Sequence, residues 1–232
     1  MSHGSACATI PLAMEMTPDR WTYTCRYLEE TFGRADRHLL GLRDRALAAG
    51  LPDIAVSADV GRLLQLLAST TAGRLGIEVG TLGGFSGIWI ARGLPRGRLI
   101  TIEREDKHAD FALAQFEGAG VAGQIELRRG AALPVLEALS RELSPGTVDF
   151  AFLDADKVEY PAYWAHLRPL IAKGGLLVAD NVLGSGGWWV DQVDHPARKA
   201  TDQLNRSLAE DPEFDAVAVP LREGLLIARR RD

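Results

Sequence analysis

The sequence predicts an α/β protein with a mostly parallel, seven-stranded sheet and helices on both faces. Between residues 74 and 179, short apolar runs alternate with helical segments at least five times, as in strands joined by crossover helices. The chain of 232 residues is 47% hydrophobic, enough to close one substantial core. Two C-terminal strand-like runs are joined by the short link 220–223, which predicts an antiparallel C-terminal edge strand.

The N-terminal part is expected to be a tail followed by a helical cap. Residues 1–16 lack both a basic leader and a long apolar run, so we expect a flexible tail without a signal peptide or membrane span. Apolar residues then recur at helical spacing from Thr17 to about Ala49, which predicts two amphipathic helices, the first beginning near Pro18, with a break around Gly33. We therefore divide one domain, residues 17–232, into a cap (17–55) and a Rossmann-like core (56–232).

The core begins with a buried helix for which Ser57 is the expected N-cap. The strands that follow are apolar runs, and the helices between them carry amphipathic or mixed patterns. The predicted strands are Arg74–Val79, Arg98–Ile102, Ile125–Arg128, Val148–Leu153, Leu176–Ala179, Phe214–Val219 and Gly224–Arg229. The predicted helices are Ser86–Arg92, Lys107–Gly118, Leu133–Leu143, Tyr163–Ile171 and Ala197–Glu210.

The net charge and the cysteine content give no support for nucleic-acid or membrane binding, and they favour a cytoplasmic protein. With 26 basic and 31 acidic side chains the net charge is -5, which gives no global reason to bind nucleic acid or an acidic membrane. Cys7 and Cys25 are too few for a disulfide framework and have no metal-ligand spacing. A reducing cytoplasm is the simplest location.

A glycine-rich loop, residues 80–84, follows the first predicted strand. In open parallel sheets ligands bind beyond the carboxyl ends of the strands, and glycines let the backbone approach a ligand closely. The dinucleotide fingerprint is incomplete, because Thr81 and Leu82 follow Gly80 where the second glycine is required. Glu78 would repel phosphate and attract a cation, so the loop favours a positively charged nucleoside; alternatively, Glu78 is a buried structural carboxylate.

Glu103 ends the second predicted strand, 23 residues after Gly80. An acidic side chain at this spacing accepts hydrogen bonds from both ribose hydroxyls of a nucleoside cofactor. The alternative is that Glu103 only caps the next helix.

Oxygen-bearing side chains follow two further strands that should be neighbours. Asp154, Asp180 and Asn181 are expected to converge and to bind a divalent cation, Mg²⁺ first, with Mn²⁺ or Ca²⁺ as alternatives. Such residues also occur at strand ends for their own turn hydrogen bonds. Lys157 lies close by, and the positive charge of a neighbouring cation favours the neutral amine that a general base needs; otherwise it is a solvated surface lysine.

Separated segments carry a family resemblance along most of the chain: residues 56–59, 78–86, 130–132, 154–160, 174–175 and 180–183. In order and spacing they resemble the cation-dependent, catechol-type O-methyltransferases that use S-adenosylmethionine, including the caffeoyl-CoA type and small bacterial relatives. The resemblance implies a class I methyltransferase fold, a homodimer and N-terminal helices that help to cover the active site. The implied cofactor residues are Val56, Glu78, Gly80, Thr81, Ser86, Glu103, Ala132 and Asp154.

The same resemblance implies metal binding by Asp154, Asp180 and Asn181 and proton removal by Lys157. A small phenolic acceptor such as a catechol would then be methylated, with no nucleic acid or membrane involved. The chain departs from the plant pattern at residues 184–189, where Gly-Ser-Gly-Gly-Trp-Trp replaces a Trp-Asn pair. We expect either a flexible wall carrying two aromatic rings or a surface loop whose tryptophans pack on the fold or a partner; Trp21 is a further candidate for a lid.

Three alternatives to this function are considered. The first keeps the cofactor but methylates a hydroxylated base in tRNA, which would need a basic patch of Arg128, Arg129 and Arg229–Arg231. The second is a nicotinamide oxidoreductase, which the missing glycine disfavours. The third is a non-catalytic nucleoside-binding module, which the combination of Lys157 with the oxygen ligands disfavours.

Overall fold

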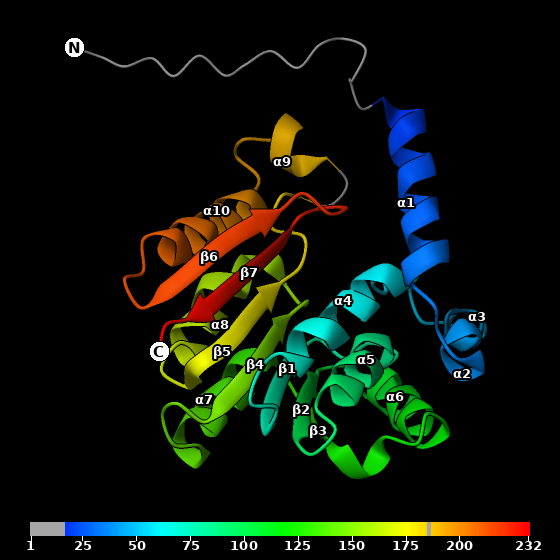
Figure 1. Cartoon of the computed structure of the whole chain (residues 1–232), viewed down its shortest axis with the longest axis horizontal. Helices are drawn as coiled ribbons and strands as arrows, with labels where there is room; N and C mark the ends of the chain where they lie inside the picture. The colour runs from blue at the N-terminus through cyan, green and yellow to red at the C-terminus, as the bar shows by residue number, and fades with distance from the viewer. Residues whose placement is uncertain (1–16, 185–186) are drawn as a thin grey trace.

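The computed structural model describes residues 17–184 and 187–232 and contains one seven-stranded sheet with helices on both faces (Figure 1). The strand order is β3-β2-β1-β4-β5-β7-β6. The strands are β1 (Leu75–Val79), β2 (Arg98–Glu103), β3 (Ile125–Arg129), β4 (Val148–Leu153), β5 (Ile171–Ala179), β6 (Phe214–Val219) and β7 (Leu225–Arg230). The order reverses between β1 and β4, which is where this class of sheet binds ligands. The predicted fold class is confirmed.

The C-terminal strand β7 is antiparallel to both of its neighbours, β5 and β6, as the short link predicts. It lies one strand in from the edge, however, and β6 forms the edge. The predicted mixed sheet with an antiparallel C-terminal strand is confirmed, and β7 is the inner strand of the pair at this edge. The burial pattern gives the reason: residues 225–228 of β7 are apolar without interruption, as in a strand flanked on both sides, whereas β6 alternates buried and exposed residues.

The helices begin and end within a few residues of the predicted positions, with three differences. The helices are α1 (Pro18–Phe32), α2 (Arg37–Leu40), α3 (Leu42–Ala48), α4 (Ala58–Ser69), α5 (Phe85–Gly93), α6 (Asp106–Gly118), α7 (Ala132–Glu142), α8 (Tyr160–Leu167), α9 (Trp188–Asp191) and α10 (Pro196–Ala209), with 3-10 turns η2 (Ala122–Gln124) and η3 (Lys157–Glu159). The second cap helix is broken at Gly41 into α2 and α3, because glycine is a poor helix former. The short helix α9 was not predicted.

The third difference is in α8 and β5. The helix begins three residues earlier than predicted, with Pro161 in its first turn, and it ends before Pro169, which cannot continue a helix. Strand β5 consequently begins at Ile171, where the sequence predicted a helix. The β4–β5 pairing is irregular between Val148 and Phe150, and two glycines of β5 accommodate the irregularity. Gly174 adopts a positive φ of 73°, and a side chain on Gly175 would collide with the backbone of Val148.

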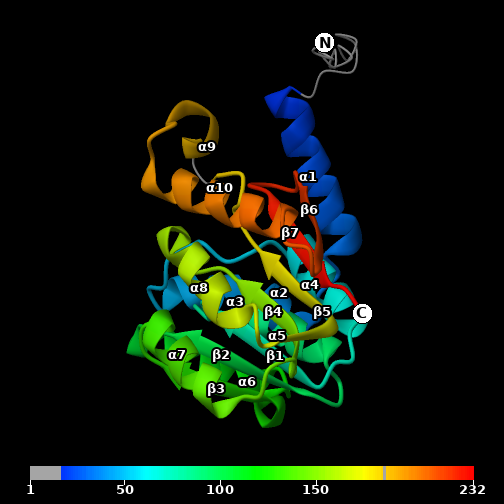
Figure 2. The ribbon, with the colours of Figure 1, turned by 90° about the vertical axis from the view of Figure 1, so that its left-hand side faces the viewer.

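Two faces of the sheet carry separate hydrophobic layers (Figure 2). Alternate residues of β4 point to opposite faces, so Ala151 and Leu153 join the cluster that contacts α7, α8 and α10, and Phe150 and Phe152 join the cluster below α4 and α5. Helices α4 and α5 approach closely because Gly61 leaves room for the ring of Trp89.

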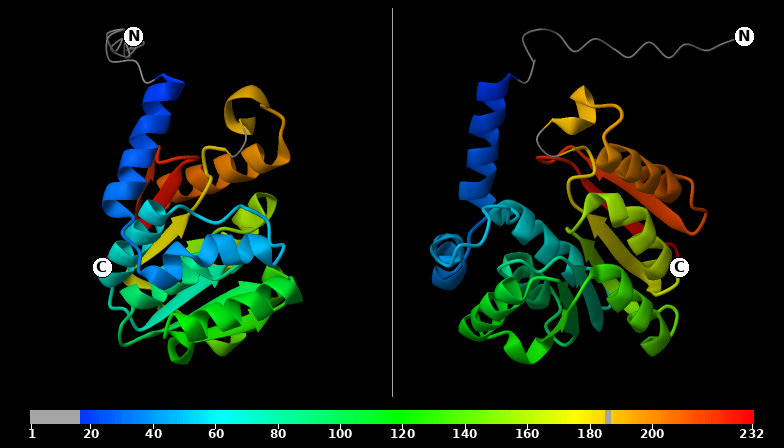
Figure 3. Two further views of the ribbon diagram at one scale, coloured as in Figure 1. Left: turned by 90° about the vertical axis from the view of Figure 1, so that its right-hand side faces the viewer. Right: turned by 180° about the vertical axis from the view of Figure 1, so that it is seen from behind.

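The N-terminal cap has two parts that differ in packing. Leu39 and Leu42 belong to the cluster around Trp89, so α2 and α3 share apolar packing with the core. Helix α1 projects from the body of the sheet, touches α4 and buries none of its residues (Figure 3). Its N-cap is Thr17, whose hydroxyl accepts a hydrogen bond from the backbone N–H of Arg20.

Within the described ranges no helix has the length and apolar character needed to cross a bilayer. The predicted tail, residues 1–16, lies outside the described residues.

Asp149 is the buried polar anchor between β1 and β4. Its carboxylate accepts hydrogen bonds from the backbone N–H groups of Arg74 (2.7 Å) and Leu75 (3.3 Å), and from the Arg74 guanidinium (2.8 and 3.1 Å). We expect Asp149→Asn to lower the free energy of unfolding by about 2 kcal/mol, because the amide mispairs with these donors. Urea unfolding checks this, with Asp215→Asn, which alters an exposed carboxylate paired with Arg231, as the matched control. Equal stability of both variants would contradict the anchoring role.

Candidate active site

A cavity of about 1180 Å³ lies at the carboxyl ends of β1, β2, β4 and β5. The glycine loop and the ends of β4 and β5 form its floor, and the α2–α3 cap contributes an apolar wall. The β6–β7 turn contributes Arg222 and Glu223 to its rim. The cavity is therefore where the switch point of the sheet predicts a ligand site.

Ten of the eleven residues predicted for the site line this cavity. They are Val56, Gly80, Thr81, Ser86, Glu103, Ala132, Asp154, Lys157, Asp180 and Asn181. Glu78 is fully buried and is not among the lining residues.

The glycine loop is shaped by three residues with positive φ. Gly80 (φ 100°) passes so close to β4 that a Cβ atom there would lie 2.3 Å from the carbonyl oxygen of Asp154. Leu82 adopts φ 47° although it has a side chain, and Gly84 (φ 84°) is the N-cap of α5. The loop thus brings bare backbone and the first turn of α5 to the cavity, an arrangement suited to close contact with a ligand.

Glu78 holds this loop from behind. Its Oε2 accepts a hydrogen bond from the Thr101 hydroxyl (2.6 Å), which also lies 2.6 Å from the hydroxyl of Thr81. Burial raises the pKa of Glu78 to about 7, although hydrogen bonds from Ser86 and Thr101 act in the opposite direction. Its Oε1 is buried and has no hydrogen-bond partner among residues 17–184 and 187–232. In this structure Glu78 therefore supports the loop, and the predicted contact with a cofactor stays a prediction.

Glu103 is 8% exposed and ties the end of β2 to the glycine loop. Its Oε2 accepts a hydrogen bond from the Leu82 N–H (2.8 Å), and its Oε1 accepts one from the Glu105 N–H (3.0 Å). The second of these bonds is the local contact that the capping alternative requires. Glu103 also lines the cavity, and a carboxylate has the capacity to accept further hydrogen bonds, such as those of a ribose.

The ends of β4 and β5 lie side by side. Leu153 pairs with Ala179 in the parallel ladder, and the Asp180 N–H donates to the Leu153 carbonyl oxygen (3.0 Å). Asp154, Asp180 and Asn181 therefore emerge next to each other at the cavity floor. Lys157 follows on η3, and its Nζ lies 2.7 Å from Asp154 Oδ1.

Negative charge accumulates at these strand ends. Burial is the main cause that raises the pKa of Asp180, and the negative charge of Asp154 raises it further. The Asn181 N–H donates a hydrogen bond to Asp180 Oδ1 (2.7 Å), which offsets part of this increase. Asn181 adopts φ 57°, a left-handed conformation that asparagine tolerates better than most residues. The carboxylates thus repel each other, and Lys157 is the cation that approaches Asp154.

Tyr160 is a site residue for which the sequence predicted no role. Its buried hydroxyl lies 3.0 Å from both the Leu153 and the Asp180 carbonyl oxygens, so it joins the ends of β4 and β5 beneath the carboxylates. The sequence signal was the tyrosine that closes the segment 154–160, and this tyrosine lies before the helix that the sequence predicted from Tyr163.

The donor set at the strand ends fits a divalent cation. Two carboxylates and one amide oxygen are hard ligands. A double positive charge would offset both the burial and the repulsion by Asp154 that raise the pKa of Asp180. Across residues 17–184 and 187–232, no three His, Cys, Asp or Glu side chains form a metal-sized group, so the predicted set depends on Asn181 as its third member.

The tryptophans of residues 184–189 pack on their own fold. The Trp188 ring stacks on His195 at 5.4 Å and 10°, and the Arg198 guanidinium lies 5.5 Å from the Trp189 ring. Neither ring lines the cavity, which favours the predicted surface loop over the substrate wall. Ser185 and Gly186 lie outside the described residues. Trp21, the suggested lid, also does not line the cavity; α1 contributes Glu29 instead.

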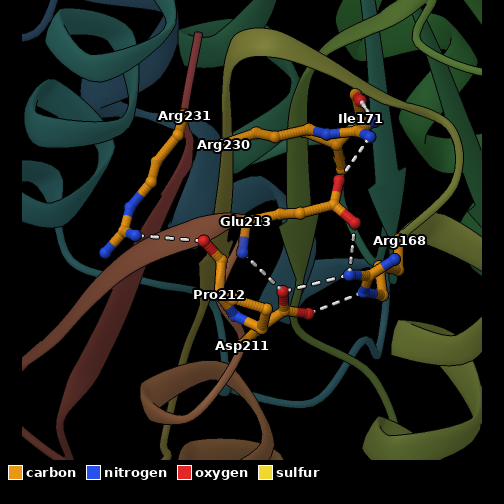
Figure 4. A network of polar contacts seen from close by, with 7 residues as sticks. All are labelled: Arg168, Ile171, Asp211, Pro212, Glu213, Arg230 and Arg231. Carbon is orange, nitrogen blue, oxygen red and sulfur yellow. Dashed lines mark hydrogen bonds and ion pairs between the residues drawn. The ribbon is translucent and has the colours of Figure 1, made fainter.

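The arginines of the proposed RNA patch are all paired with acidic side chains. Arg128 contacts Glu126 and Glu142, and Arg129 contacts Asp106 and Asp110. At the C-terminus Arg229, Arg230 and Arg231 contact Asp232, Glu213 and Asp215. Figure 4 shows part of this network, in which Arg168 bridges Asp211 and Glu213. These pairs remove the unopposed positive surface that a phosphate backbone requires.

Comparison with known proteins decides the family. The O-methyltransferase family matches residues 29–231. The chain belongs to this family. It is 40% identical to a catechol O-methyltransferase of Mycobacterium tuberculosis, over 83% of this chain and 86% of the relative. It is 37% identical to a catechol O-methyltransferase of Niastella koreensis, over 84% and 88%. These findings confirm the predicted family and enzyme class, an S-adenosylmethionine-dependent O-methyltransferase.

A solved relative has the same architecture. The O-methyltransferase from Bacillus cereus in complex with SAH aligns with a TM-score of 0.82 at 32% identity, over 92% of this chain and 99% of that one. The class I methyltransferase fold expected from the sequence is thereby confirmed.

Glu78 generates a prediction on pH and stability. Its pKa is about 7 in the folded protein and about 4.5 when unfolded, so folding favours the protonated form. The stability it contributes is fully present below about pH 4.5 and is lost as the pH rises through 7. Relative to Glu78→Gln, we expect the wild-type free energy of unfolding to fall by about 3 kcal/mol between pH 4.5 and 8.

Urea unfolding of the cofactor-free protein at a series of pH values measures this difference. Glu117→Gln, which changes an exposed glutamate outside the cavity, is the control for the loss of one charge. Parallel pH profiles for the wild type and Glu78→Gln would show that the carboxyl group is not perturbed.

Proposed function

We propose that this O-methyltransferase moves a methyl group from S-adenosylmethionine to a hydroxyl of a small catechol-like aromatic acceptor, with the help of a divalent cation. The observation that carries the proposal is the convergence of Asp154, Asp180, Asn181 and Lys157 on the floor of the cavity that the glycine loop also lines. One cavity thus offers a cofactor cradle, an oxygen ligand set and a base.

The cofactor part of the cavity suits a nucleoside with a positive charge. Glu103 offers its carboxylate to the ribose, and Gly80 leaves space where any side chain would collide with Asp154. Ser57 lines the same region, and its buried hydroxyl oxygen has no partner in the described part of the chain. When bound, S-adenosylmethionine supplies the sulfonium methyl group, and the surrounding carboxylates favour its positive charge.

The cation is expected to be Mg²⁺, with Mn²⁺ or Ca²⁺ as alternatives, held by Asp154, Asp180 and Asn181. When bound, it supplies a positive charge that favours the ionised form of a chelated hydroxyl. Tyr160 fixes the relative position of the two strand ends, so the ligand oxygens are held before any ion arrives.

Lys157 is placed to take the proton from the acceptor hydroxyl. Its side chain is 16% exposed, and its ammonium group contacts Asp154 and lies 5.4 Å from the ring centre of Tyr160. Binding of a cation by Asp154 would compete with this ion pair and leave the amine available as a base.

The acceptor itself would lie against the cap. Leu40 and Ile54 line the cavity but are more than two-thirds exposed, so an aromatic ring could cover them. A phenolic acceptor therefore suits this wall. We also retain the predicted homodimer, for which Tyr23 and Tyr27 on α1 provide exposed aromatic surface, and the predicted cytoplasmic location.

Removal of the cation tests the metal role. We expect chelation to abolish methyl transfer to catechol and added Mg²⁺, Mn²⁺ or Ca²⁺ to restore it. Asp180→Asn should weaken cation binding at least about 10-fold, because a charged ligand is replaced by a neutral one. Isothermal titration with the metal salt measures binding apart from activity, with Asp194→Asn, an exposed aspartate, as the control. Full activity in the presence of chelator would exclude the metal while leaving the cofactor site intact.

Replacement of Lys157 tests the base. We expect Lys157→Met to lower kcat by about 100- to 10,000-fold, the usual range for loss of a general base, and to leave S-adenosylmethionine affinity within about threefold of the wild type. Labelled methyl transfer and calorimetry measure the two quantities. A large loss of cofactor affinity with little change in kcat would assign Lys157 to binding instead.

A further inference from the structure

Arg222 occupies an unusual backbone position on the rim of the cavity. It lies in the turn between β6 and β7 with a φ of 51°, one of three non-glycine residues with positive φ in the described chain. The other two, Leu82 and Asn181, belong to the cofactor loop and to the proposed metal site. Backbone strain of this kind persists where the surrounding structure enforces it, often at functional sites.

The turn that carries Arg222 is fixed to the segment after the metal-site asparagine. The Leu183 N–H donates to the Glu223 carbonyl oxygen (2.8 Å), and the Val182 N–H donates to the Gly224 carbonyl oxygen (3.1 Å). Gly224 packs so closely that a Cβ atom there would lie 2.5 Å from the Leu183 side chain. Arg222 is therefore held on the acceptor side of the cavity, near Asn181.

The hydrogen-bonding state of Arg222 differs from that of Arg43 and Lys157, two other cations that line the cavity. Arg43 donates two hydrogen bonds to Asp53 (2.6 and 2.7 Å), and Lys157 donates one to Asp154. Arg104 is 68% exposed beside Glu105 on the cofactor side. Lysine and arginine are absent from residues 1–16 and 185–186, so these segments add no further cation.

Arg222 is two-thirds buried, and its guanidinium has one polar contact within residues 17–184 and 187–232. This contact is an ion pair with Glu29 of α1 at 3.5 Å, without a hydrogen bond. A guanidinium presents five N–H donors in a planar fork that matches a carboxylate. Within the described residues the charged Arg222 fork thus makes no hydrogen bond, while the turn that carries it is held by backbone hydrogen bonds, and Arg222 lines the cavity.

We propose that Arg222 is a specificity residue that binds a carboxylate substituent on the aromatic acceptor, so that the enzyme prefers dihydroxylated aromatic acids to unsubstituted catechol. The proposal rests on the function proposed above and names the substrate class of the same site. The two hydroxyl groups of the acceptor would face Asp180 and Asn181, and its carboxylate would accept hydrogen bonds from the Arg222 guanidinium at the rim. Glu29 would then compete with the acceptor carboxylate for Arg222, because the Arg222–Glu29 ion pair must break when the acceptor binds.

Competition between two diols tests this role. The measured quantity is the ratio of kcat/KM for 3,4-dihydroxybenzoate to kcat/KM for catechol. We expect Arg222→Asn to lower this ratio about 10- to 100-fold, the range for loss of a charge-assisted hydrogen-bonded pair. Asparagine tolerates the left-handed backbone, so the variant removes the fork without adding strain at the turn. Arg222→Lys, which keeps the charge but not the fork, should retain part of the preference.

Glu29→Gln provides a change in the opposite direction. It frees the guanidinium from its competitor, so we expect the ratio to rise. Arg206→Asn, on the exposed side of α10 and paired with Asp202, is the control for loss of one positive charge and should leave the ratio unchanged. A ratio that Arg222→Asn does not move, or a wild type that prefers catechol, would overturn the proposal.

The design separates this proposal from the proposed function. Methylation of catechol with an unaltered ratio in Arg222→Asn would refute only the role of Arg222. If the wild type methylated neither diol, the proposed function would fail, and calorimetric titration with 3,4-dihydroxybenzoate would still decide whether Arg222 binds the carboxylate. Equal affinity of wild type and Arg222→Asn in that titration would refute it.

Discussion

The parallel pairing of β1, β4 and β5 is the constraint on which the site depends. Val79 pairs with Leu153, and Leu153 pairs with Ala179, so three strands end at one level of the sheet. Every chain segment that leaves this edge must turn within the same small volume. The glycine loop and the acidic strand ends become neighbours for this reason, although they are far apart in the sequence.

This arrangement concentrates negative charge, and the structure offsets it locally. Glu103 accepts hydrogen bonds from two backbone N–H groups, and Lys157 forms an ion pair with Asp154. Burial raises the pKa of Glu78 and so favours its uncharged, protonated form. Within the described residues the Asp180 carboxylate accepts one hydrogen bond, from the Asn181 N–H, and burial keeps its pKa raised. The site therefore favours positively charged ligands, since a sulfonium and a divalent cation would each reduce the remaining repulsion.

The cap and the β6–β7 turn contribute a different kind of surface from the floor. Apolar residues of α2, α3 and the segment after them face the cavity, and Arg222 is tied to the strand end through the backbone of Leu183 and Glu223. Trp188 and Trp189 do not belong to this rim, because the Trp188 ring stacks on His195 and the Trp189 ring contacts Arg198 of α10.

The sequence by itself determined the order of strands and helices, the glycine loop and the residues at the strand ends, because hydrophobic period and turn chemistry are local properties. Ten of the predicted site residues consequently line one cavity. Only the tertiary structure decided that Glu78 lies behind the loop, that β7 lies inside β6, and that Tyr160 joins two strand ends. It also decided that Arg222 meets Glu29 across the rim. These features depend on contacts between segments distant in the chain, and local pattern carries no information about which of several compatible partners a side chain or strand will meet.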